Sequence, residues 1–103
     1  MQRTNAEAAR SALGFAQRAG KVIAGDFAVE KAVKAKKVAL VVLDASASEA
    51  TRERYAGLCT RCEIPCLLME NMDAAIGRYG RRIAAVTDKG FGRMILDKTI
   101  QGG

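Results

Sequence analysis

The stretch that decides the fold is residues 38–43, which read Val38-Ala39-Leu40-Val41-Val42-Leu43. All six side chains are apolar and half of them are the β-branched valine, so the run favours a strand. A strand exposed on one face alternates apolar with polar residues, whereas this run is apolar at every position. We therefore expect it to form the centre of a sheet that is covered on both faces.

Apolar blocks on both sides of this run supply further strands and helices. Strands are predicted at 21–24, 66–69 and 83–87, and between them apolar residues recur at helical intervals. This alternation predicts an α/β fold in which helical layers sandwich the sheet and the crossovers are right-handed. The helices are predicted to bury Ala9, Ala12, Leu13, Ala16, Val29, Ala32, Val33, Tyr55, Leu58, Cys59, Cys62, Phe91, Met94 and Ile95.

Side chains that can cap helices indicate where these helices begin. Thr4 with Glu7, and Ser46 with Glu49, both have the spacing of a capping box. Glycine and proline mark where helices stop. The remaining predicted caps are Asp26, Asn71 and Asp88, and the predicted stops are Gly20, Lys36 and the Ile64-Pro65 pair.

The totals indicate one basic domain over residues 1–103, with residues 1–4 and 99–103 frayed. A chain of this length can bury a core of its own. Its longest apolar run is too short to cross a bilayer, and the charged residues 1–10 lack the apolar middle of a secretory signal. Three cysteines, an odd number, fit a reducing compartment. We expect a cytoplasmic monomer with no membrane contact.

The charge is unevenly distributed along the chain. The net charge is +6, which favours anionic partners. Residues 18–37 hold six basic and two acidic side chains, whereas residues 44–73 hold six acidic and three basic ones. The positive charge is therefore expected on the second helix and the turn before it, and again in a later arginine-rich segment.

The turn at Gly25-Asp26 is the first candidate site. If the central strands are parallel, this strand-to-helix turn emerges at the end of the sheet where ligands bind. The free N–H groups that start the second helix suit a phosphate, and Gly25 lets a polymer backbone approach closely. The alternative is that Asp26 only caps the helix and that the lysines only solvate it.

The segment Arg78-Tyr79-Gly80-Arg81-Arg82 is the second candidate site. Three guanidinium groups, one aromatic ring and a flexible glycine suit unpaired bases and bridging phosphates. The alternative is an ordinary solvated loop with Tyr79 packed inward.

The sequence contains no arrangement typical of catalysis or of metal binding. It has no histidine, no Gly-x-Ser-x-Gly motif and no phosphate-loop signature. Cys59, Cys62 and Cys66 are too few for a closed zinc site without another ligand, so we interpret them as small buried hydrophobes. We expect neither enzymatic activity nor a cofactor.

Five blocks of the chain, in order, resemble one known family. They are 19–33 (Ala-Gly-Lys-Val-Ile-Ala-Gly-Asp-Phe-Ala-Val-Glu-Lys-Ala-Val), 38–44, Ile64-Pro65, 75–78, and 85–88 with Gly90-Phe91. The chain is similar to the bacterial YlxQ-type members of the kink-turn RNA-binding ribosomal-protein superfamily, which includes large-subunit proteins seven-Ae and thirty-e. The resemblance implies a three-layer α/β/α sandwich around a four-stranded mixed sheet, and binding to a sharply bent RNA internal loop.

The family's signature, Gly-x-Asn-Glu-x-x-Lys, falls on the Gly25 turn. Gly25 and Lys31 match it, whereas Phe27 and Ala28 stand where the asparagine and glutamate would be. Phenylalanine and alanine cannot hydrogen-bond to base edges, so we expect backbone contacts with a weaker or different sequence preference. Phe27 either stacks on a base or packs against the first helix.

The resemblance and the two candidate sites together define the expected RNA-binding residues and partners. The RNA is expected to be ribosomal or other noncoding RNA, with ribosomal or ribonucleoprotein partners. The alternative function is a protein-interaction module that uses the acidic face of the third helix. The expected RNA-binding residues are Lys21, Gly25, Asp26, Phe27, Ala28, Lys31, Lys34, Ile76, Arg78, Tyr79, Arg81 and Arg82.

Overall fold

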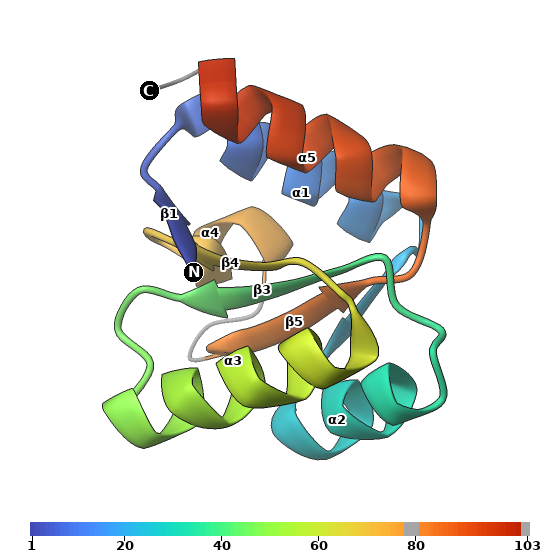
Figure 1. Cartoon of the computed structure of the whole chain (residues 1–103). Helices are drawn as coiled ribbons and strands as arrows, with labels where there is room; N and C mark the ends of the chain where they lie inside the picture. The colour runs from blue at the N-terminus through green and yellow to red at the C-terminus, as the bar shows by residue number, and fades with distance from the viewer. Residues whose placement is uncertain (78–80, 102–103) are drawn as a thin grey trace.

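The computed structural model describes residues 1–77 and 81–101, which form a three-layer α/β/α sandwich. Helices α1, α4 and α5 cover one face of the sheet, and α2 and α3 cover the other (Figure 1). The strand order is β1-β4-β3-β5-β2. The strands are β1 (Gln2–Thr4), β2 (Val22–Ala24), β3 (Leu40–Asp44), β4 (Cys66–Met69) and β5 (Ile83–Val86). The helices are α1 (Glu7–Arg18), α2 (Asp26–Lys34), α3 (Glu49–Cys62), α4 (Met72–Ile76) and α5 (Lys89–Gln101).

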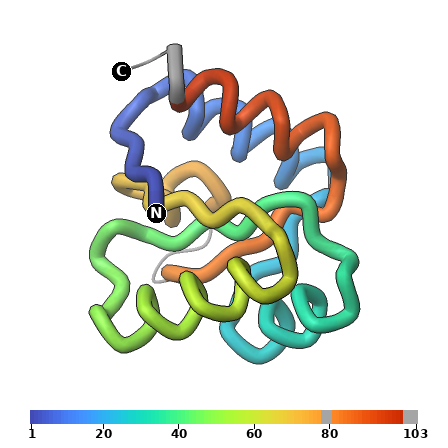
Figure 2. The backbone as a smooth tube through the Cα atoms, in the orientation of Figure 1, coloured from blue at the N-terminus to red at the C-terminus, as the bar shows by residue number. Residues whose placement is uncertain are grey.

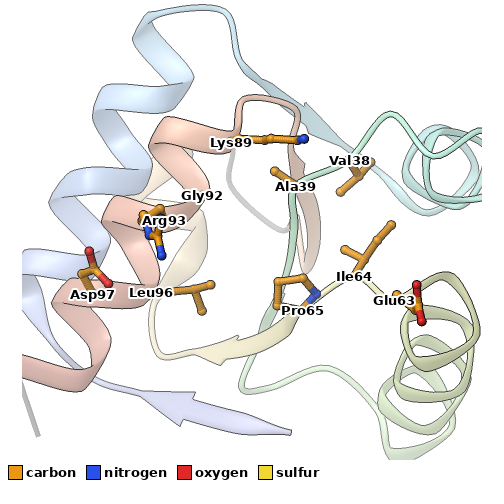
Figure 3. A pocket seen from close by; sticks show the side chains of 10 residues that line it. All are labelled: Val38, Ala39, Glu63, Ile64, Pro65, Lys89, Gly92, Arg93, Leu96 and Asp97. Carbon is orange, nitrogen blue, oxygen red and sulfur yellow. The ribbon is translucent and has the colours of Figure 1, made fainter.

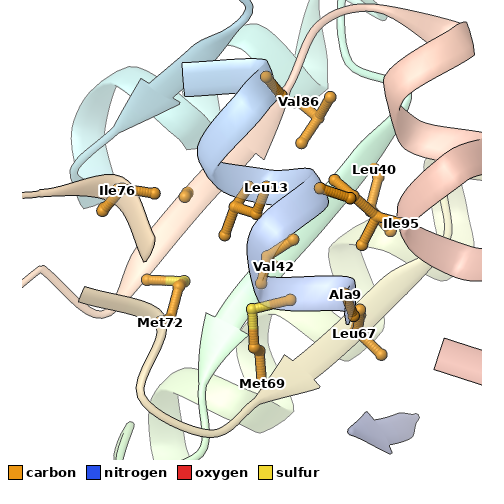
Figure 4. Packing of buried hydrophobic residues seen from close by; sticks show 13 residues of the cluster. Ala9, Leu13, Leu40, Val42, Leu67, Met69, Met72, Ile76, Val86 and Ile95 are labelled. Carbon is orange, nitrogen blue, oxygen red and sulfur yellow. The ribbon is translucent and has the colours of Figure 1, made fainter. Parts of the chain in front are cut away.

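Strand β3 is the central strand, as its apolar sequence predicts. Leu40 and Val42 point into the core under α1 and α5, where Figure 4 shows them beside Leu13 and Ile95. The alternate residues of β3 point into the opposite core, under α2 and α3. Because no side chain of β3 faces water, every position of the strand except its last residue, Asp44, is apolar.

The sheet has five strands, so the expectation of four was wrong. Residues Gln2–Thr4 are not frayed: they pair in parallel with β4, with Thr4 opposite Met69. Thr4 also does not cap α1, because its Oγ1 accepts a hydrogen bond from Ala6 N (3.0 Å), which itself occupies the cap position. A three-residue edge strand has too few residues to show alternation, so the tertiary pairing with β4 decides its conformation.

Two other predicted caps differ from the structure. Ser48, and not Ser46, caps α3, since its side chain accepts the hydrogen bond from Thr51 N. Asn71 occupies the cap position of α4 but its side chain makes no capping bond there. Asp88 caps α5 as predicted, with its Oδ1 3.0 Å from Phe91 N.

The predicted core is largely confirmed. The prediction that Met94 is buried was wrong, because 39% of its surface is exposed. Ala32, Cys62 and Phe91 are half-buried at the margins of the two clusters, and the other predicted core residues are buried.

Strand direction gives the sheet two distinct ends. β1, β2, β3 and β4 run in the same direction, and β5 runs against them. The carboxyl ends of β2 and β3 therefore meet the start of β5: Gly25 N donates to Ile83 O (3.0 Å), and Asp44 N donates to Arg82 O (2.8 Å). We call this the carboxyl end of the sheet. At the opposite, amino end, Thr87 N donates to Lys21 O (2.9 Å). Figure 2 follows the backbone through the sandwich in chain order, from blue at the N-terminus to red at the C-terminus.

Asp44, the last residue of β3, ties this carboxyl end together. Its Oδ2 accepts hydrogen bonds from Ser46 N and Ser46 Oγ, and its Oδ1 accepts one from Met72 N at the start of α4 (2.9 Å). Burial alone would raise the pKa of Asp44, but the bonds from Ser46 and Met72 outweigh it and leave the pKa below its ordinary value. Asp44 therefore caps the start of α4, a role that was predicted for Asn71.

We expect Asp44→Ala to lower the free energy of unfolding by about 2–3 kcal/mol near neutral pH, because it leaves the buried Met72 N–H and the part-buried Ser46 N–H without an acceptor. The folded-state pKa of Asp44 is lowered, so its contribution is fully present above the unfolded pKa of about 3.9 and is lost as pH falls through the folded pKa. Urea unfolding at neutral and acid pH measures this. The exposed Asp97→Ala is the matched control, with an expected change within about 0.5 kcal/mol. An equal loss in both variants would contradict the role given to Asp44.

Candidate nucleic-acid interface

The Gly25 turn and the arginine-rich segment lie side by side at the carboxyl end of the sheet. Gly25 has φ 106°, a conformation that favours glycine, and a Cβ added to it would lie 3.3 Å from Arg81 Nη1. The guanidinium of Arg81 therefore covers the turn that starts α2. Arg78 and Tyr79, also predicted in this segment, lie outside the described residues.

Arg82 extends the basic surface toward β3 and α3. Its backbone carbonyl pairs with Asp44 N, and its Nε donates to Ser46 Oγ (3.1 Å). Beside it is an open hollow of about 420 Å³ that is lined by Ser46, Ala47, Ser48, Thr51, Arg82 and Ile83. Hydroxyl groups thus lie beside the guanidinium of Arg82, the residue that follows Arg81.

Phe27 is the most exposed large apolar side chain described. It is 82% exposed, so it does not pack against the first helix. Ala28 and Lys31 are also exposed, and Lys31 lies less than two helical turns beyond Gly25. We call Gly25, Phe27, Lys31, Arg81 and Arg82 the Gly25–Arg81 site.

The prediction that Asp26 caps α2 was wrong, because residues of α3 bind its carboxylate. Asp26 Oδ2 lies 2.6 Å from Arg54 Nη2, and Asp26 Oδ1 accepts a hydrogen bond from the Tyr55 hydroxyl (2.7 Å). The bonds from Arg54 and Tyr55 hold the pKa of Asp26 below its ordinary value. Burial, together with the carboxylate of Asp26, raises the pKa of Tyr55, so the phenol stays protonated as a donor. Since Arg54 offsets the charge of Asp26, the start of α2 is fixed without presenting a free anion.

The contacts that Arg54 and Tyr55 make with Asp26 are the part of the site that sequence reasoning missed. Tyr55 was predicted as a core residue of the third helix, and its ring is indeed fully buried. Arg54 contacts both Asp26 and Glu30 on α2, with Arg54 Nη1 3.0 Å from Glu30 Oε1. The only available signal was the phenolic oxygen itself, because a buried tyrosine hydroxyl needs a partner.

Three predicted RNA-binding residues do not lie at the Gly25–Arg81 site. Lys21 precedes β2 and pairs with Thr87, so it lies at the amino end of the sheet. Lys34 is the last residue of α2, and its Nζ lies 3.9 Å from Glu30 Oε2. Ile76 is buried in the core beneath α1, with 3% of its surface exposed, because α4 packs on the sheet. The β2 strand and the α2 helix each carry the chain from one end of the sheet to the other, which separates Lys21 and Lys34 from Gly25.

The cysteines and the acidic residues of α3 lie outside the Gly25–Arg81 site. Cys59 is buried in the core between the sheet and α3, and Cys62 and Cys66 are half-buried beside it. Across residues 1–77 and 81–101, no group of three or more potential metal ligands gathers. In the same part of the chain, no helix has the length and apolarity needed to span a bilayer. Glu49 and Glu53, on the acidic face of α3, are exposed.

Comparison with known proteins shows where the chain belongs. The model of the ribosomal protein L7Ae/L30e/S12e/Gadd45 family matches residues 7–93, which include the Gly25 turn and residues 81–82. The RNA-binding protein YlxQ of Bacillus subtilis (strain 168) is 32% identical over 87 residues, covering 82% of this chain and 87% of that protein.

Two solved structures share the fold. A protein of unknown function from Bacillus halodurans superposes with a TM-score of 0.86 at 31% identity, over 93% of this chain and 99% of the other. The Giardia lamblia 15.5kD RNA binding protein superposes with a TM-score of 0.72 over 90% of this chain and 82% of the other. At 14% identity, the second similarity concerns the fold alone. With the family pattern matched from α1 into α5, and a YlxQ relative aligned over most of both chains, this protein belongs to the ribosomal protein L7Ae/L30e/S12e/Gadd45 family.

Proposed function

We propose that the chain is a non-catalytic, cytoplasmic RNA-binding protein that grips a sharply bent, kink-turn-like RNA at the Gly25–Arg81 site. The observation that carries the proposal is the contact between the Gly25 turn and Arg81, which joins two basic segments far apart in the sequence. The family match supports it, as does the similarity to a protein named as RNA-binding. Structured ribosomal or other noncoding RNA is the proposed partner.

The backbone at the start of α2 supplies the central contact. The first N–H groups of a helix have no partner within the helix and attract anions. Gly25 has no side chain, which leaves room for Arg81 to lie over the turn, where its guanidinium offers a planar fork of donors for a phosphate. Bending an RNA brings several phosphates close together, and these cations offset their repulsion.

Phe27 and Ala28 determine how bases are read. Neither side chain can form the bidentate hydrogen bonds that distinguish one base from another. An exposed phenylalanine ring does stack on a base, whatever its identity, and such stacking contributes about 1–3 kcal/mol. The proposal is therefore recognition of a bent shape with a stacked, unpaired base and little selection of sequence.

We expect Phe27→Ala to weaken binding to a kink-turn RNA by roughly 5-fold to 150-fold, because it removes one stacked base contact. The stability of the Phe27→Ala variant should equal that of the wild type, since the ring of Phe27 is exposed. Phe15→Ala is the matched control, because Phe15 is also exposed (55%) but lies on α1, under Arg18. Fluorescence anisotropy with a labelled RNA measures both. Equal affinities for the two variants would exclude stacking by Phe27.

We expect Lys31→Glu combined with Arg81→Glu to weaken binding of the same RNA by at least about a hundredfold in low salt and to reduce the salt slope by about 2. The control is Arg61→Glu combined with Lys98→Glu, which changes the net charge equally at exposed positions outside the site. Thermal unfolding should be nearly unchanged in both proteins. An equal loss of binding in the control would mean that only total charge matters, and the proposed site would be wrong.

A further inference from the structure

A second cluster of cations lies at the amino end of the sheet, where the Gly25–Arg81 site does not reach. It gathers from the residue before β2, the turn before β3 and the start of α5. Every member is exposed. We call it the amino-end cluster, and it consists of Lys21, Lys36, Lys37, Lys89 and Arg93.

Backbone pairing holds these segments together. Lys21 O accepts the hydrogen bond from Thr87 N, and Ala39 N donates to Val86 O (2.8 Å). The start of β2, the end of β5 and the start of β3 are thus adjacent, and Lys21, Lys89 and Lys37 each lie within two residues of one of these bonded positions. The juxtaposition comes from the sheet and does not depend on the rotamer of any lysine.

Lys89 and Arg93 also line an open hollow of about 560 Å³ together with Val38 and Ala39 (Figure 3). Glu63, which follows α3, and Asp97 on α5 also line this hollow, on opposite sides of it in Figure 3. The basic surface is therefore bounded where these two carboxylates lie.

The amino-end cluster carries most of the excess positive charge. The net charge of the chain is +6, and in residues 21, 36–39 and 87–93 five cations stand against a single carboxylate, Asp88. Asp88 is engaged as the cap of α5, through its bond to Phe91 N. Among the described residues, none of the five cations lies within 4.0 Å of a carboxylate oxygen. By contrast, Arg54 and Lys34 pair with acidic side chains of α2.

We propose that the amino-end cluster binds the phosphate backbone of a second RNA segment, so that the protein joins two RNA segments across its sheet. The inference rests on the proposed RNA-binding function and adds a surface at the other end of the molecule. Lysine is depleted in protein–protein interfaces, whereas its compact, mobile ammonium suits a phosphate. Four of the five cations are lysines, which favours RNA over an acidic protein. The segment bound here is an ordinary duplex, because the cluster offers charge and no exposed aromatic ring.

The first test separates the two surfaces with two RNA probes, a kink-turn RNA and a duplex without mismatches or bulges. We expect Lys37→Glu combined with Lys89→Glu to weaken duplex binding by at least about tenfold in low salt and to reduce its salt slope by about 2. Binding of the kink-turn RNA should remain within about threefold of the charge-matched control, Arg61→Glu with Lys98→Glu. Lys31→Glu with Arg81→Glu should show the reverse pattern.

The second test measures bridging directly. An immobilised kink-turn RNA should capture a labelled duplex when the wild-type protein is added, and neither double variant should support this capture. Duplex affinity equal to that of the control would overturn the amino-end proposal and leave the Gly25–Arg81 site standing. Unchanged kink-turn binding by Lys31→Glu with Arg81→Glu would instead overturn the proposed function. Polyglutamate is the third probe: if Lys37→Glu with Lys89→Glu loses polyglutamate but keeps the duplex, the surface binds an acidic protein and the RNA proposal is wrong.

Discussion

The position of one antiparallel strand, β5, between β3 and β2 determines the candidate site. Because β5 runs against its neighbours, its first residues lie where β2 and β3 end. This direction places Arg81 against Gly25 and joins Arg82 to Asp44 through a backbone hydrogen bond. In an all-parallel sheet, the arginines that precede β5 would emerge at the opposite end, together with Lys21. The ladder that holds the core thus also brings together two basic segments that are about fifty residues apart.

Two carboxylates stabilise the turns at this end by reaching across the fold. Asp44 accepts bonds from Ser46 and from the start of α4, and Asp26 accepts bonds from two neighbouring residues of α3. Both have a lowered pKa because these donors favour the charged form. The cationic side chains of this loop surface repel one another and cannot fix it themselves, so these two carboxylates supply the anchors. The acids here satisfy donors and cations of the protein, which leaves Arg81, Arg82 and Lys31 to face solvent.

The fold also separates the positive charge into two groups. In the sequence, Lys21 lies next to the Gly25 turn and Lys34 follows it on the same helix, so all these residues form one basic stretch. In space, a three-residue strand and a nine-residue helix are enough to carry the chain across the sheet and back. Members of that stretch therefore face opposite ends of the molecule, and only there do Lys37 and Lys89 become neighbours. Cations therefore lie at both ends of a compact sheet, as the proposed binding of two RNA segments requires.

The sequence by itself determined the architecture, because apolar periodicity and β-branched runs reflect burial, and burial decides which segments become strands and helices. The central strand, both helical layers, the Gly25 turn and the cap at Asp88 followed from such local patterns. Tertiary structure alone decided the features that depend on partners distant in the chain. These are the edge strand β1, which exists because β4 offers it hydrogen bonds; the acceptors Asp44 and Asp26, whose donors lie on other elements; and the burial of Ile76. Local sequence encodes which face of an element is apolar. It does not encode which exposed charged residues will lie together at one end of the sheet. Strand order and direction set that neighbourhood, and with it the division of the basic residues between the two ends.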